Sequence, residues 1–166
     1  MITRLFHNAI RATDLEVTRN FYTRFLGMIV DERRPPMDVP GFWLRAAVPG
    51  GLDLIHVFGG SFAEVADGSI PTGGAAIHHL SYFCKGYDVM RRRLVDHGLS
   101  WRGQIAPVLG LWQIFVHDPN GILLELTFDA VAEGIPTPTI PEGLRYDGVL
   151  DWFDPAQYGV FALGPL

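Results

Sequence analysis

The chain has 166 residues, of which 48% are hydrophobic and 19% are charged, and its mean hydropathy is +0.18. This profile is typical of a globular protein, and the length is sufficient for one core or for two small fused modules. The net charge of −5 and the absence of a basic run argue against nucleic acid or an anionic membrane surface as a partner. No apolar stretch of the sequence approaches the roughly 20 residues of a membrane span.

The N-terminal segment of the sequence lacks the layout of a signal peptide. Cys84 is the single cysteine, so the sequence excludes an intrachain disulfide. Both features favour a cytoplasmic location.

The first half of the chain predicts a β-α-β-β-β order. Residues 5–10 are apolar and indicate a strand, and apolar residues recur at helical spacing between Asp14 and Gly27. Proline and glycine pairs then separate further strands from one another. These strands are expected at residues 28–33, 42–48 and 52–58.

The second half repeats this order after a connector of small and polar residues. A strand is expected at 76–83 and a helix at 87–97, which Gly98 ends. Three more strands are expected at 101–107, 111–117 and 122–128. The predicted organisation is therefore a first module at 1–60, a connector at 61–74, a second module at 75–129 and a C-terminal extension at 130–166.

The register of the two halves supports a structural repeat. The separation between His7 and His79 along the chain is nearly the same as that between His56 and Glu125. The ends of the two expected helices, at Gly27 and Gly98, are separated by almost the same length of chain. We therefore expect an α+β fold of two tandem modules, in which each first strand and each last strand carries one potential ligand.

Each of these four potential ligands stands in an otherwise apolar strand. A buried carboxylate such as Glu125 is costly without a partner, because burial penalises its charge. One divalent metal, with three imidazoles and this carboxylate, removes that cost, and the donors suit Fe, Ni, Co, Mn or Zn. Singly, each histidine also fits a surface or core position. A register shift of one residue would make His78 the ligand in place of His79, while His117 is expected to be exposed to solvent or, as the alternative, to line the pocket.

Three segments resemble a known family, the vicinal oxygen chelate superfamily, which includes glyoxalase I, methylmalonyl-CoA epimerase, extradiol dioxygenases, fosfomycin-resistance proteins and bleomycin-binding proteins. The segments are Leu5-Phe6-His7-Asn8-Ala9-Ile10, Ile77-His78-His79-Leu80-Ser81-Tyr82 and Asp118-Pro119-Asn120-Gly121-Ile122-Leu123-Leu124-Glu125-Leu126. Residues Asn20 to Gly27 are similar to the first helix of the family. The resemblance covers residues 4 to 129 and implies two βαβββ modules that form a cup-shaped mixed sheet around one metal.

The resemblance implies that His7, His79 and Glu125 fall at three ligand positions. His56 falls at the fourth, where glyoxalase I usually has a glutamate, so this histidine is expected either to bind the metal or to act as the catalytic base. Glu125 is the second residue expected to be catalytic. Without His56, the other three form the two-histidine, one-carboxylate set that extradiol dioxygenases use for Fe(II).

Three functions remain open at this point. The first is a glyoxalase-like or epimerase-like isomerase or lyase acting on a small substrate with neighbouring oxygens. The second is an Fe(II) dioxygenase that cleaves a catechol-like ring, and the third is a metal-free binding protein of the bleomycin-resistance type. We also expect a homodimer, with the ligand set either within one chain or shared across the dimer. The aromatic C-terminal extension is expected to pack on the modules.

Overall fold

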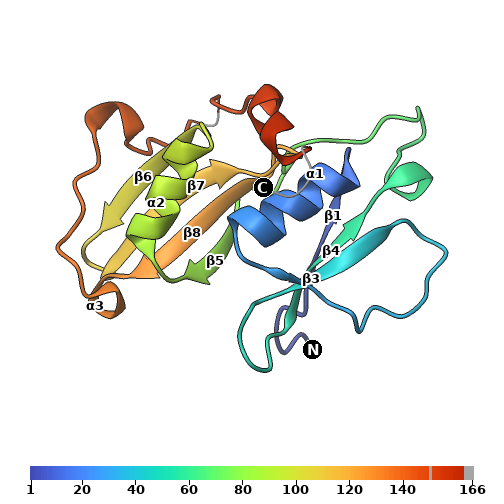
Figure 1. Ribbon diagram of the computed structural model, residues 1–166, viewed down its shortest axis with the longest axis horizontal. Helices are drawn as coiled ribbons and strands as arrows, with labels where there is room; N and C mark the ends of the chain where they lie inside the picture. Colours follow the sequence, from blue (N-terminus) through green and yellow to red (C-terminus); the bar gives the residue numbers. More distant parts are fainter. Residues whose placement is uncertain (150, 163–166) are drawn as a thin grey trace. The chain divides into compact units, whose positions relative to one another are not determined.

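The computed structural model describes residues 1–149 and 151–162, with only the backbone of Asp53, and it divides into two compact units (Figure 1). The first unit comprises residues 1–72 together with Phe161 and Ala162, and the second comprises Gly73–Val160. Each unit contains one four-stranded mixed sheet. No helix among the described residues is long and apolar enough to cross a membrane.

The first unit follows the predicted order. Its sheet has the strand order β1-β4-β3-β2, with β1 parallel to β4 and the other pairs antiparallel. Its elements are β1 (Asn8–Arg11), α1 (Leu15–Asn20), a π-helical turn (Phe21–Phe25), β2 (Ile29–Val30), β3 (Gly41–Arg45), β4 (Asp53–Phe58) and a short 3-10 turn (Gly60–Phe62). The Asp14 side chain caps α1 by accepting hydrogen bonds from the backbone N–H groups of Glu16 and Val17.

The second unit repeats the arrangement, with the strand order β5-β8-β7-β6 and β5 parallel to β8. The elements are β5 (Leu80–Cys84), α2 (Tyr87–Asp96), β6 (Trp101–Ala106), β7 (Leu111–His117) and β8 (Leu123–Asp129). Short helical segments follow at α3 (Ala130–Glu133) and at the 3-10 turns Glu142–Leu144 and Pro155–Phe161. The predicted α+β fold with a βαβββ order in each half is confirmed.

Each sheet buries one face against its own helix, because side chains alternate along a strand. In the first unit, Ile55 and Leu44 on β4 and β3 are fully buried, as are Phe21 and Tyr22 of the helical segment. Figure 1 shows α1 lying along the first sheet and α2 along the second. The opposite face of each sheet carries the predicted ligands.

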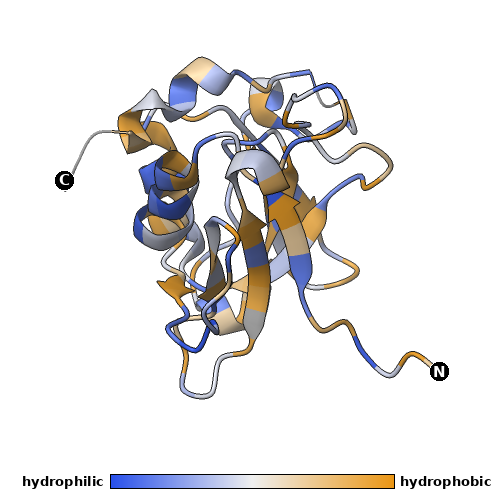
Figure 2. Ribbon diagram, turned by 90° about the vertical axis from the view of Figure 1, so that its right-hand side faces the viewer, coloured by the Kyte–Doolittle hydropathy of each residue, from blue (hydrophilic) through white to orange (hydrophobic). Residues whose placement is uncertain are grey.

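The first strand of each half begins later than expected. Strands were expected at 5–10 and 76–83, but β1 begins at Asn8 and β5 at Leu80. Residues 1–6 are exposed and form an extended arm, which Figure 2 shows leading away from the strands. Before β5 the chain instead makes a tight turn, in which the N–H of Ile77 donates to the carbonyl of Gly74 at 2.8 Å. His7 and His79 therefore each stand directly before a strand.

The C-terminal extension contacts the face of the second sheet that α2 leaves open. Tyr146 stacks on Phe115 of β7 with ring centroids 3.8 Å apart, and Trp152 meets His117 edge-on at 5.0 Å. The Tyr158 hydroxyl donates to the carbonyl of His117 at 2.5 Å. These contacts cover His117, which is only 4% exposed, so the expectation of an exposed histidine was wrong.

Beyond that segment, Phe161 belongs to the first unit. Its ring packs edge-on against Phe21 and Phe25, and its carbonyl accepts a buried hydrogen bond from the Asn20 side chain at 2.7 Å. Phe161 thus contributes to the core beneath the first sheet.

The buried His117 predicts an acid-sensitive fold. Burial lowers the pKa of His117 from 6.5 to about 4, so the unfolded chain takes up a proton there before the folded one. The contribution of neutral His117 to the free energy of unfolding is fully present above pH 6.5 and is lost as the pH falls to 4. This contribution is about 3 kcal/mol. Urea unfolding between pH 7 and 4 should show His117→Gln losing less stability than the wild type over this range. An equal loss in both proteins would contradict the assignment.

Candidate functional site

The first predicted pair lies together in the first unit. The rings of His7 and His56 stack with centroids 3.7 Å apart and planes 18° apart. Trp43 stacks on the other side of His56 at 4.0 Å and 2°. Trp43 and His56 are directly opposed in the β3–β4 register and so point to the same side of the sheet. The imidazole of His56 is thereby fixed between two aromatic rings.

Both histidines of this pair hold a nitrogen atom that is buried and has no hydrogen-bond partner among the described residues: Nδ1 of His7 and Nε2 of His56. A buried polar atom without a partner is costly, and such atoms are often explained by a bound ion or by a catalytic role. Burial lowers the pKa of His56, and the nearby His7 and Arg34 lower it further. His56 is therefore neutral at pH 7 and keeps a lone pair on one nitrogen.

The second predicted pair lies together in the second unit. Nε2 of His79 is 3.5 Å from Oε2 of Glu125. Two hydroxyl groups donate to the other carboxylate oxygen, Oε1: Ser81 at 2.6 Å and Thr127 at 3.0 Å. Ser81 is opposite Glu125 in the parallel β5–β8 register, and Thr127 is two residues further along β8, on the same face. One carboxylate oxygen is thus held in place while the other is turned toward His79.

Sequence reasoning missed these two hydroxyl residues, although a signal was present. A residue two positions from a strand carboxylate shares its face, which identifies Thr127 directly from the sequence. Ser81 required the pairing register of β5 with β8 as well.

His78 lies beside His79 and does not face Glu125. The Nδ1 atoms of the two histidines are 2.8 Å apart, and their rings meet at 81°. Because both residues precede β5, they are not forced to opposite sides as residues within a strand would be. On the far side of His78, Nε2 is 3.4 Å from the hydroxyl of Tyr146.

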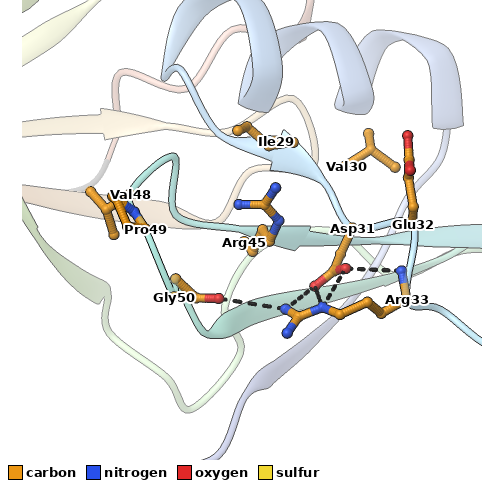
Figure 3. Close-up of a pocket in the computed structure, with 10 residues that line it drawn as sticks. Ile29, Val30, Asp31, Glu32, Arg33, Arg45, Val48, Pro49 and Gly50 are labelled. Carbon is orange, nitrogen blue, oxygen red and sulfur yellow. Dashed lines mark hydrogen bonds and ion pairs between the residues drawn. The ribbon is translucent and has the colours of Figure 1, made fainter.

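A pocket of about 520 Å³ opens in the first unit at β2, the end of β3 and the turn that follows it (Figure 3). Arg45, at the end of β3, lies between Val48 and an ion pair of Asp31 with Arg33. Asp31 is 2% exposed and holds the Arg33 guanidinium with both carboxylate oxygens. The volume is within the range of small-molecule sites.

The structure thus brings the four predicted ligands together as two pairs, one in each unit. Within residues 1–149 and 151–162, no group of three or more His, Cys, Asp or Glu side chains is close enough to hold a metal ion. The donors nevertheless suit a divalent metal, since imidazole and carboxylate are ligands of Fe, Co, Ni, Mn and Zn. The unpartnered nitrogens of His7 and His56 are the atoms that a metal would satisfy.

Comparison with known proteins agrees with this fold. A curated relative, "Glyoxylase I 4" of Arabidopsis thaliana, is 25% identical over 130 residues, which is 75% of this chain and 70% of the relative. A putative glyoxalase family protein from Bacillus anthracis aligns with a TM-score of 0.55 at 20% identity, over 78% of this chain and 97% of that one. The fosfomycin resistance protein FosX of Listeria monocytogenes aligns with a TM-score of 0.56 at 16% identity, over 81% and 100%. These structures share the fold.

The family model spans the part of the chain that carries both ligand pairs. The model of the Glyoxalase/Bleomycin resistance protein/Dioxygenase superfamily matches residues 4–126, a range that contains all four predicted ligands. The chain therefore belongs to this superfamily, the vicinal oxygen chelate proteins.

Proposed function

We propose that the protein is a metal-dependent enzyme of the vicinal oxygen chelate type, acting on a small substrate with two neighbouring oxygen atoms. The reaction is a glyoxalase-like or epimerase-like isomerisation or lyase step. His7, His56, His79 and Glu125 hold one divalent metal, either within one chain or across a two-fold dimer.

The observation that carries this proposal is that each ring of the stacked His7–His56 pair has a buried nitrogen without a partner. Nδ1 of His7 and Nε2 of His56 have no hydrogen bond among the described residues, and a structural role alone would leave that cost uncompensated. The orientation of Glu125 adds support, since its Oε1 is occupied by two hydroxyls and its Oε2 is left toward His79. Hydrogen bonds of this kind commonly orient the ligands of metal sites.

When bound, the metal would supply Lewis-acid stabilisation of negative charge on the substrate oxygens. The residues of the chain supply the rest. In the alternative arrangement, in which His7, His79 and Glu125 hold the metal, the neutral ring of His56, fixed between Trp43 and His7, is suited instead to accept a proton from a substrate carbon acid. The pocket of the first unit gives a small substrate room, and Arg45 offers a positive charge at its side.

A second candidate is an Fe(II) dioxygenase that cleaves a catechol-like ring. It is favoured by one observation, the two-histidine, one-carboxylate subset of His7, His79 and Glu125. Aerobic purification with loss of activity, restored by ferrous iron and a reductant, would identify this reaction. Metal analysis of the purified protein separates both enzymes from a metal-free binding protein, and an assay against methylglyoxal hemithioacetal and a panel of catechols separates the two reactions.

Glu125 supplies the only anionic ligand of the proposed set, so Glu125→Gln should remove most of the bound metal. The measurement is metal content after equilibration with a slight excess of Co²⁺ or Zn²⁺ and gel filtration. Glu142→Gln is the matched control, because Glu142 is an exposed glutamate of the same unit. Full metal occupancy in Glu125→Gln would contradict the ligand assignment.

His56 should be the ligand whose loss affects metal binding least, because the remaining three donors already form a sufficient set. His56→Ala should retain part of its metal but lose turnover by at least about a hundredfold, the range of a removed general base. His97→Ala, at the end of α2, is the control. Complete loss of metal from His56→Ala, with an unchanged circular dichroism spectrum, would make His56 an equal ligand.

We also expect a homodimer, since the chain is apolar for its length. Sedimentation equilibrium at micromolar concentration should give twice the 18.4 kDa mass of one chain. A mass of one chain at that concentration would exclude the arrangement in which two chains share a metal.

A further inference from the structure

We propose that His78 and Tyr146 are positioning residues for His79, so that the C-terminal extension completes the second unit's half of the site. This inference rests on the proposed function, because it assigns a role to His79 as a ligand. Tyr146 lies beyond the residues that the superfamily model matches, which end at 126.

Tyr146 is fixed against the sheet at a defined place. Its backbone N–H donates to the carbonyl of Gly103 on β6 at 2.9 Å, and its ring stacks on Phe115 with planes 11° apart. Phe115 is directly opposite Glu125 in the β7–β8 register, so its side chain shares the face that carries the carboxylate. Trp152 meets the Tyr146 ring edge-on at 6.1 Å. The phenol is thereby brought to the Glu125 face by the extension.

From this phenol a continuous row of polar contacts leads to the carboxylate. The Tyr146 hydroxyl is 3.4 Å from Nε2 of His78, which is long for a hydrogen bond, and Nδ1 of His78 is 2.8 Å from Nδ1 of His79. Nε2 of His79 then faces Glu125 at 3.5 Å. Each ring nitrogen in this row faces one neighbour in the row. The tautomer of one imidazole therefore fixes the tautomer of the next.

A neutral imidazole has one N–H donor and one acceptor nitrogen, so the row has two consistent proton orders. In the first, Tyr146 donates to His78, His78 donates through Nδ1 to His79, and His79 presents its Nε2–H to Glu125. In the second, His79 donates through Nδ1 to His78, His78 donates through Nε2 to Tyr146, and Nε2 of His79 is a lone pair.

The carboxylate favours the first order, and a ligand role for Nε2 requires the second. In passing from the first order to the second, each proton inside the row moves across its own hydrogen bond. The Nε2 proton of His79 leaves to solvent, and the Tyr146 oxygen takes one proton from water, so the row keeps the same number of protons. In the second order, His78 accepts the Nδ1–H of His79 and so keeps the Nε2 lone pair of His79 available for a metal. Tyr146 in turn accepts the Nε2–H of His78.

The metal-free protein provides the first test. Long-range ¹H–¹⁵N correlation of the imidazole nitrogens at pH 8 should show His78 as the Nδ1–H tautomer in the wild type. Tyr146→Phe keeps the stacked ring but removes the hydroxyl that donates to Nε2 of His78, and should raise the fraction of the Nε2–H tautomer of His78 above its wild-type value. Tyr87→Phe is the matched control, because the Tyr87 hydroxyl is buried on the helix side of the same unit. A mixed His78 tautomer in the wild type, or no change in Tyr146→Phe, would overturn the proposal.

The second test uses Co²⁺ alone as the probe in calorimetric titrations. His78→Ala should weaken Co²⁺ binding about tenfold, the low end for a residue that orients a ligand. Tyr146→Phe should weaken it less, and should have no effect when His78 is already alanine. An undiminished affinity in His78→Ala, or an equal effect of Tyr146→Phe in both backgrounds, would overturn the positioning role. Absence of Co²⁺ binding to the wild type would refute the proposed function instead, and the tautomer measurement would still decide how His78 is held.

Discussion

The parallel pairing of the first and last strands of each module is the constraint on which the candidate site depends. In the first unit β1 pairs with β4, and Ala9 is opposite His56, so the residue just before β1 reaches the ring on β4. In the second unit β5 pairs with β8, and Ser81 is opposite Glu125, with His79 shortly before it on the same side. Within each module, backbone hydrogen bonds thus hold two stretches of chain side by side that are distant in the sequence. One predicted ligand from each stretch meets the other at this strand pair. The helices contribute only by covering the other face of each sheet.

The fold could be predicted from the sequence because its signals are local and repeated. Helical spacing between Asp14 and Gly27, glycines that end each helix, and alternating apolar strands recur in both halves at nearly constant separation. The repeat predicted one ligand for the first and one for the last strand of each half, while the contacts of His7 with His56 and of His79 with Glu125 come from the structure. The starts of β1 and β5 did not follow, because apolar residues such as Leu5 and Ile77 fit a strand locally but have no strand partner in the structure.

The surroundings of the ligands could be predicted less well, because they depend on contacts between distant residues. Nothing in the sequence near Trp43 indicates that its ring lies on His56, since that requires the exact antiparallel register of β3 with β4. The burial of His117 depends in the same way on aromatic residues much later in the chain. The extension has no periodic pattern and makes its contacts one side chain at a time, which leaves no signature that a window of sequence could reveal.

The place of Phe161 in the first unit has a consequence for the order of folding during synthesis. The polypeptide enters the second unit after Thr72 and returns to the first only at Phe161, so the second unit is an insertion within the first. The core under the first sheet lacks the Phe161 ring and the hydrogen bond to Asn20 until the ribosome has passed through the whole of the second unit. The residues of the second unit are continuous in the sequence, so all of them have been synthesised before the first unit is complete. The N-terminal half, although synthesised first, is therefore the last to reach its finished state.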